Sequence, residues 1–212
     1  FITDASHELK TPLAIISANA EVLQYKGDGN EWTQNIIDQT KHMGKLINQL
    51  LVLAKLDEVQ EKSEKQEADL KLLLEETIEP FEEVATQKKV TLKLHLEEGV
   101  TIRVNREQIA QLVSILTENA AKYVNDGGKI VWRLTKTQHG AVLVVKNTTE
   151  KELPDTKRMF DRFYRSDSSR SSKTGGQGIG LSIAKKIVDS HKGSITAKAG
   201  DGMVTFRVSL PK

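Results

Sequence analysis

Residues 2–23 read ITDASHELKTPLAIISANAEVL, and this stretch decides the fold of the first part of the chain. Its heptad positions form two rows: Ile2, Leu9, Ile16 and Leu23 in one, and Ser6, Leu13 and Ala20 in the other. This spacing predicts a helix, from Phe1 to about Tyr25, that packs against other helices in a bundle.

A histidine lies outside the apolar face of this predicted helix. At about 100° per residue, His7 falls about 130° from the centre of that face, so we expect its imidazole to meet water. Thr11 lies one turn further along the same surface, and Glu8 is three residues before Thr11. Pro12 removes a hydrogen bond to the carbonyl of Glu8, so we expect a bend there. Alone, such a histidine is ordinarily a solvated surface residue; motifs further along the chain favour a functional role.

A second helix is predicted from Glu31 to about Val59, after a turn at 26–30. Its apolar residues recur at steps of four and three: Trp32, Ile36, Met43, Leu46, Leu50 and Leu53. Two long helices joined by a short turn form a helical hairpin, which cannot enclose a core alone. We expect two copies to form a dimeric four-helix bundle. The alternative is that both helices pack on the remainder of the same chain.

The composition excludes several classes of protein. Lys and Arg number 31 against 29 Asp and Glu, and this balance argues against a general nucleic-acid surface. The chain has no cysteine, which excludes disulfides and thiol nucleophiles, and its five histidines lack metal-ligand spacing. It contains no apolar run of about 18 residues and no signal peptide. Because it begins inside a predicted helix, we expect a fragment of a longer protein.

The rest of the chain predicts a second, α+β domain. Residues 61–69 are rich in Glu, Lys and Gln and are expected to link a first domain at 1–60 to a second at 70–212. The patterns predict helices at 70–88 with a break near Pro80, at 106–123 with Asn105 as the cap, at 156–164 and at 178–192. They predict strands at 90–96, 101–104, 129–136, 141–146, 194–199 and 204–210. This order indicates an α/β sandwich, with residues 166–177 as a functional loop.

Two stretches of this second domain point to phosphate chemistry. Residues 175–180 read GGQGIG and open a predicted helix, where free backbone N–H groups and the helix dipole favour phosphate. Asn119 and Lys122 lie one turn apart, so an amide oxygen for Mg²⁺ and an ammonium for phosphate could address one anion. Taken singly, the glycines could form a hinge and the second pair an ordinary helix surface.

Together these stretches resemble a two-component sensor histidine kinase over nearly the whole chain. Residues 1–13 resemble the family's phosphoacceptor box, with its His-Glu-x-x-Thr-Pro core intact. Residues 117–123 resemble the N box, 159–165 (MFDRFYR) the F box, and 176–183 the second glycine box. The resemblance implies a dimeric bundle followed by a Bergerat-type ATP-binding domain.

The resemblance also implies the roles of individual residues. His7 would be phosphorylated, Glu8 would orient it and accept its proton, and Thr11 with Glu8 would support dephosphorylation of the partner. Asn119 would bind Mg²⁺. The nucleotide would be held by Asn119, Lys122, Tyr123, Asn147, Arg165, Gly176, Gly178, Gly180 and Leu181.

Two departures from the family's pattern bear on this site. The first glycine box is replaced by VKNTT at 145–149, with Asn147 where the family has the aspartate that contacts adenine. An amide oxygen can accept a hydrogen bond but carries no charge, so we expect weakened nucleotide affinity. Ile115 stands where histidine kinases usually have a second asparagine, four residues before Asn119, which leaves Mg²⁺ one ligand poorer.

The activity implied by the resemblance is autophosphorylation of a histidine with ATP and transfer to an aspartate of a response regulator receiver domain. The chain would be the cytoplasmic portion of a homodimer, attached to the membrane only through upstream segments. Two alternatives stay open. A degenerate kinase could act only as a response-regulator binding module. An ATPase of the gyrase and chaperone type would need a water-activating glutamate where Ile115 stands, and isoleucine cannot act as a base.

Overall fold

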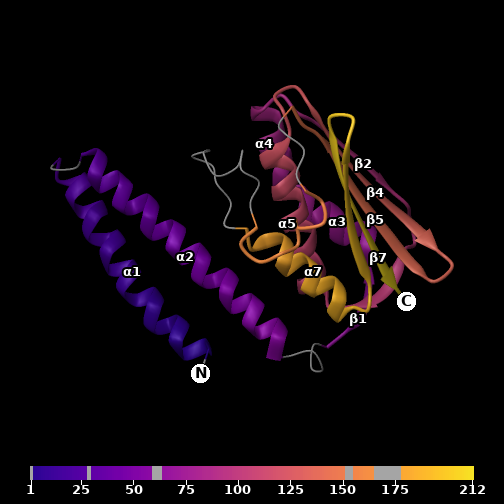
Figure 1. The fold of residues 1–212 in the computed structure, drawn as a ribbon, viewed down its shortest axis with the longest axis horizontal. Helices are drawn as coiled ribbons and strands as arrows, with labels where there is room; N and C mark the ends of the chain where they lie inside the picture. Colours follow the sequence, from indigo (N-terminus) through magenta and orange to yellow (C-terminus); the bar gives the residue numbers. More distant parts are fainter. Residues whose placement is uncertain (1, 28–29, 59–63, 151–154, 165–177) are drawn as a thin grey trace. The chain divides into compact units, whose positions relative to one another are not determined.

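The computed structural model describes residues 2–27, 30–58, 64–150, 155–164 and 178–212; within these ranges the side chains of 2–10, 42, 50 and 52–58 are not described. The chain divides into two compact units, residues 1–58 and 59–212, and each is treated by itself. In Figure 1 the first unit is the indigo and purple helix pair, and the second contains the sheet.

The first unit is a helical hairpin, as the heptad spacing predicted. Helix α1 spans Ile2–Tyr25 and continues through Pro12, and helix α2 spans Glu31–Glu58. Asn30 caps α2, because its side-chain oxygen accepts hydrogen bonds from the backbone N–H groups of Trp32 (2.9 Å) and Thr33 (3.2 Å). The cap gives α2 a defined start immediately after the turn.

Small and β-branched side chains fill the contact between the two helices. Leu13 and Ala20 of α1 are 9% and 3% exposed, and Ile37 of α2 is 4% exposed. Thr33 and Thr40 are also buried, and the hydroxyl of Thr40 donates to backbone carbonyls within α2, so its burial leaves no polar group unpaired.

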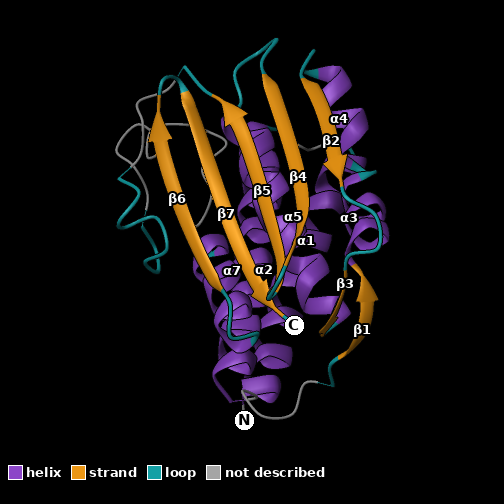
Figure 2. Cartoon of the chain, turned by 90° about the vertical axis from the view of Figure 1, so that its right-hand side faces the viewer, coloured by secondary structure: helices purple, strands orange, loops and turns teal. Residues whose placement is uncertain are grey.

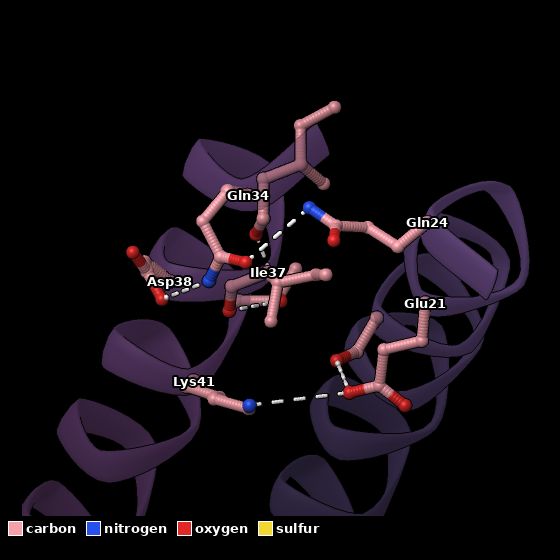
Figure 3. A network of polar contacts seen from close by, with 9 residues as sticks. Glu21, Gln24, Gln34, Ile37, Asp38 and Lys41 are labelled. Carbon is pink, nitrogen blue, oxygen red and sulfur yellow. Dashed lines mark hydrogen bonds and ion pairs between the residues drawn. The ribbon is translucent and has the colours of Figure 1, made fainter. Parts of the chain in front are cut away.

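Polar side chains join the helices near the turn (Figure 3). Gln24 of α1 donates to the side-chain oxygen of Gln34 at 3.3 Å, and Lys41 Nζ lies 4.0 Å from Glu21 Oε1. Both members of the charged pair are more than half exposed, so the pair contributes little to stability.

Among the described side chains, most members of the remaining predicted rows of the hairpin are exposed. Ile16 and Leu23 of α1 are 47% and 45% exposed, and Trp32, Ile36 and Met43 of α2 are 67%, 43% and 48% exposed. Each helix therefore has a second apolar row, beside the row that it turns to its partner helix.

The segment expected to be a linker contains a strand. Strand β1 (Gln66–Asp69) pairs antiparallel with β3 (Thr101–Val104), so the last four residues of the expected linker at 61–69 form a strand of the second unit. Ala68 lies opposite Ile102, and both are buried. Asp69 then caps the next helix, because its carboxylate accepts from the backbone N–H of Lys71 at 2.8 Å. One small apolar residue among charges is too short a pattern to indicate a strand.

The main sheet of the second unit has the order β2-β4-β5-β7-β6. Its strands are β2 (Thr91–Leu96), β4 (Lys129–Thr137), β5 (Gly140–Thr148), β6 (Ser194–Gly200) and β7 (Met203–Pro211). Strand β2 is parallel to β4, and the other neighbours are antiparallel. Figure 2 shows this sheet in front of helices, which confirms the predicted α+β sandwich.

The helices are α3 (Leu70–Ile78), α4 (Phe81–Gln87), α5 (Arg106–Tyr123) and α7 (Gly180–Ser190). Helix α5 packs against α3, α7 and β5, and its predicted apolar side, Ile109, Leu112, Val113 and Leu116, is fully buried. From the sheet, Trp132 and Phe206 are the largest fully buried side chains. In the described part of the chain, no helix is both long and apolar enough to cross a membrane.

The helix predicted at 156–164 is wrong. This segment forms successive turns, in which the backbone N–H of Arg158 donates to the carbonyl of Asp155 (3.2 Å) and that of Asp161 to Arg158 (2.9 Å). The ring of Phe160 meets Phe206 edge-on at 6.4 Å between centroids. Packing on the sheet therefore fixes this segment in place of a helix.

Candidate active site

The C-terminal half of α5 carries the predicted magnesium and phosphate residues. Asn119, Lys122 and Tyr123 are all half-buried, and Asn119 and Lys122 lie one turn apart. Lys122 Nζ lies 5.2 Å from the centre of the Tyr123 ring. Because α5 is packed on α3, α7 and β5, it presents these side chains from a fixed element.

Asn147 lies at the end of β5, where the family's adenine-contacting aspartate was expected. It pairs with Ile130 on one side and Val204 on the other, so it shares the sheet face that the helices cover. It is 2% exposed, and its amide nitrogen donates to the carbonyl of Thr148 at 3.1 Å. The side chain is therefore held in place by its own strand.

The predicted F box and second glycine box meet through their backbones. The N–H of Phe163 donates to the carbonyl of Gly178 at 2.8 Å. Gly178 has φ +72°, and a Cβ there would lie 2.7 Å from the carbonyl carbon of Phe163 and the oxygen of Tyr164. Only glycine fits this approach. Arg165 and Gly176, which we also assigned to the site, lie outside the described residues.

Helix α7 begins beside α5. A Cβ on Gly180 would lie 3.5 Å from Cγ2 of Ile115, and Leu181 is half-buried. Ile179 occupies the N-cap position of α7 and makes no side-chain cap hydrogen bond. A helix start whose first N–H groups lack a side-chain cap is suited to bind phosphate.

The phosphoacceptor residues lie on the other unit. His7 and Glu8 belong to the helical backbone of α1, and their side chains lie outside the description. Thr11 is exposed, four residues after His7. The water-facing imidazole therefore stays a prediction.

The structure brings together some of the predicted residues and adds others. It joins Gly178 to Phe163, and Gly180 to Ile115, and sequence reasoning missed both contacts. In the sequence, nothing except the glycine itself indicated that residue 178 would adopt a positive φ. Among the described residues, no cluster of three or more His, Cys, Asp or Glu side chains is arranged to hold a metal ion.

Comparison with protein families gives two matches that divide the chain as the fold does. Residues 104–212 match the family of histidine kinase-, DNA gyrase B- and HSP90-like ATPases. Residues 1–59 match the His Kinase A (phospho-acceptor) domain.

Individual relatives agree with the family matches. Sensor protein DltS of Streptococcus agalactiae is 35% identical over the whole chain, which covers 53% of DltS. The chain thus spans about half the length of the curated relatives that it matches.

Solved structures support the same fold. The catalytic domain of histidine kinase ThkA is 27% identical with a TM-score of 0.63, over 70% of this chain and 96% of that one. Full-length ShkA has a TM-score of 0.83 at 21% identity, over 99% of this chain and 45% of that one, and supports the fold alone. The chain therefore belongs to the histidine kinase-, DNA gyrase B- and HSP90-like ATPases, and its two domains are those of a sensor histidine kinase.

Proposed function

We propose that this chain is the catalytic portion of an ATP-dependent protein-histidine kinase. The observation that carries the proposal is the contact of α7 with α5: a glycine-rich helix start without a side-chain cap lies against the helix that bears Asn119 and Lys122. A half-buried amide and ammonium, with free helix N–H groups, fit a polyphosphate and its Mg²⁺. The similar ShkA structure is a complex with AMPPNP, which supports a nucleotide site in this fold.

Each residue assigned to the site in the second unit has a part in holding the nucleotide. Asn119 offers its amide oxygen to Mg²⁺, and Lys122 offers a positive charge to the phosphates. The N–H groups at the start of α7 cradle the phosphates, which is why a close backbone approach at Gly178 and Gly180 matters. The remaining contacts are assigned to Tyr123, Asn147, Arg165, Gly176 and Leu181.

The first unit supplies the acceptor. Bound ATP·Mg²⁺ supplies the γ-phosphoryl group and neutralises part of its charge. A nitrogen of His7 forms the new N–P bond as the bond from phosphorus to the bridging oxygen breaks, and ADP keeps that electron pair. Glu8 accepts the ring proton. Phosphoryl transfer depends mainly on alignment and charge neutralisation, so an exposed histidine on a helix is a sufficient acceptor.

The exposed apolar rows of the hairpin support a homodimer with a four-helix bundle. From His7 the phosphoryl group passes to an aspartate of a response regulator receiver domain, and Glu8 with Thr11 supports its later removal. The chain is proposed to act on the cytoplasmic side, as part of a membrane-attached protein.

A binding module without kinase activity is the second candidate. It is favoured by Asn147, which carries no charge and whose amide nitrogen donates to the backbone of its own strand. A weakened adenine contact would lower ATP affinity, and the hairpin could still bind a response regulator.

Labelling with γ-labelled ATP and Mg²⁺ tests these proposals on the full chain. We expect acid-labile, base-stable label on the wild-type protein and none on His7→Gln. His95→Gln is the matched control, since His95 is an exposed histidine on β2. Free phosphate without protein label would support an ATPase, and neither product would support the binding module.

A further inference from the structure

A buried histidine of the second unit has no part in the site described above. His191 is 4% exposed and follows the last residue of α7. Its Nε2 accepts the backbone N–H of Asn105 at 3.1 Å, and its Nδ1 lies 2.8 Å from the carbonyl oxygen of Ile187. A carbonyl can only accept, so these partners assign the proton to Nδ1 and the lone pair to Nε2. The imidazole must therefore be neutral to make both bonds.

This imidazole joins the end of one site helix to the start of the other. Asn105 caps α5, because its side-chain oxygen accepts the N–H of Gln108 at 2.9 Å. The hydroxyl of Ser190, the last residue of α7, donates to the carbonyl of Ile187 at 2.8 Å, and its oxygen lies 3.4 Å from Oε1 of Gln108. Helices α5 and α7 also pack on each other. His191 therefore sets the spacing of these helices at the ends opposite Asn119 and Gly180.

The segment that leads into β1 is bound at the same place. Lys65 Nζ donates to the carbonyl of Ser190 at 3.1 Å, and Nε of Arg103 donates to the carbonyl of Lys65 at 3.2 Å. The amide of Asn105 donates to the carbonyl of Glu64 at 3.5 Å. Residues 64–65, the first described residues after the hairpin, are thus hydrogen-bonded to the cap residue of α5 and to the last residue of α7.

The charges around His191 oppose its protonation. Burial lowers the pKa of His191, and the Lys65 ammonium lowers it further, whereas the bond to Ile187 acts in the opposite sense. The segments that meet at His191 also carry Glu64, Arg103, Arg106, Glu107, Lys186, Asp189 and Lys192, and of these Arg106 is paired with Glu76 and Asp189 with Lys185. A proton on Nε2 would point at the N–H of Asn105 and break that bond.

We propose that His191 is a positioning residue for the nucleotide site: its neutral imidazole fixes the start of α5 against the end of α7, and its loss or protonation lets the two site helices shift. The inference rests on the proposed ATP site, because a movement of α5 against α7 is detected through its effect on ATP binding. The hydrogen bond that Nε2 accepts from Asn105 sets the position of α5. Protonation of the ring would break this bond, which makes the position of α5 depend on pH.

Two substitutions separate these contributions in the full chain. His191→Phe keeps a ring but leaves the Asn105 N–H without an acceptor, so the KM for ATP should rise about tenfold while kcat changes by less than about threefold. His191→Gln keeps an acceptor near the position of Nε2 and cannot be protonated. We expect the KM of wild type to rise as the pH falls from 7 to 5.5, and His191→Gln should keep the wild-type KM at pH 7 and abolish that rise.

A third variant and a second readout make the test independent of kinase activity. Lys65→Met removes a positive charge near His191, so the pH midpoint of the wild-type response should move to higher pH. In nucleotide-free protein, hydrogen exchange at residues 104–108, corrected for its intrinsic pH dependence, should speed up in His191→Phe and, in wild type, at pH 5.5.

An unchanged KM and unchanged exchange in His191→Phe, or a wild-type pH response in His191→Gln, would overturn the inference. If wild type binds no ATP, the proposed function fails, and the exchange measurements still decide whether His191 holds the start of α5.

Discussion

The two units of this chain differ in how completely they bury their large apolar side chains. In the second unit, Trp132, Phe206 and Leu74 are at most 1% exposed, because a sheet and its helices close a core between them. In the hairpin, large apolar residues such as Ile16 and Trp32 are 47% and 67% exposed. Two helices share only one contact line, so a second apolar row on each has nothing within the hairpin to cover it.

This difference indicates how the two units are stabilised. The second unit carries its stability within its own fold, and its site residues are presented by packed helices. The hairpin needs a partner to cover the exposed apolar row of each helix, called here its outer row. We propose that this partner is a second copy of the chain. The following predictions test this contrast, beginning with the largest effect.

Removing core volume from the second unit should have the largest effect. Leu74→Ala, at a fully buried position of α3, should lower the free energy of unfolding by about 2–5 kcal/mol. Leu72→Ala on the same helix, where the side chain is 54% exposed, should change it by less than about 0.5 kcal/mol. Urea unfolding followed by Trp132 fluorescence, in a Trp32→Phe background, reports on this unit; equal effects of the two substitutions would contradict the contrast.

A charge on the outer row of the hairpin should weaken self-association. Ile16→Glu should raise the dimer dissociation constant about ten- to hundredfold, since full burial of such a side chain contributes about 1.5–3 kcal/mol. Sedimentation velocity over a dilution series measures this constant. Val84→Glu, at a 38% exposed position of α4, is the control and should leave it unchanged. Equal dissociation constants for the two variants would show that the outer row of the hairpin is not part of the dimer interface.

The glycines at the start of α7 should differ in their tolerance of a methyl group. Gly178→Ala forces φ +72° on alanine and places Cβ 2.7 Å from the backbone of Phe163, so it should destabilise the second unit by about 1–3 kcal/mol and weaken ATP binding. Gly180→Ala meets only Ile115, at the ordinary contact distance of 3.5 Å, and alanine favours a helix over glycine, so it should change stability by less than about 1 kcal/mol. Urea unfolding and calorimetry with ATP measure both effects. A stable, tightly binding Gly178→Ala would refute the strain argument.

The stability of the second unit should depend on pH through His191. Its pKa is lowered in the folded protein, so the unfolded chain binds more protons as the pH falls below about 6.5. This contribution to stability is complete above that pH and is lost as the pH falls through the folded-state pKa. Urea unfolding of wild type and His191→Gln at pH 7.5 and 5.5 should show the larger loss in wild type. A loss of the same size in both would assign the pH dependence to other groups.

Local patterns in the sequence predicted the helices and strands with strong periodicity. Helix α5 has the predicted bounds and the predicted cap, because Asn105 and the apolar spacing after it act within one helix. Strand β1 was missed, since its one buried residue, Ala68, is matched only by Ile102 on another strand. The helix predicted around Phe160 was wrong, since the contact of that ring with Phe206 belongs to tertiary packing.

The sequence by itself determined the two domains, the positions of most of their elements and the family, because helix periodicity, strand alternation and box motifs are carried by neighbouring residues. Only the tertiary structure decided which elements meet at the site. The bond from Asn105 to His191 joins residues 86 positions apart, and Gly178 adopts its left-handed backbone against Phe163. Such contacts depend on how the chain folds back on itself, and the spacing of nearby residues carries no record of them.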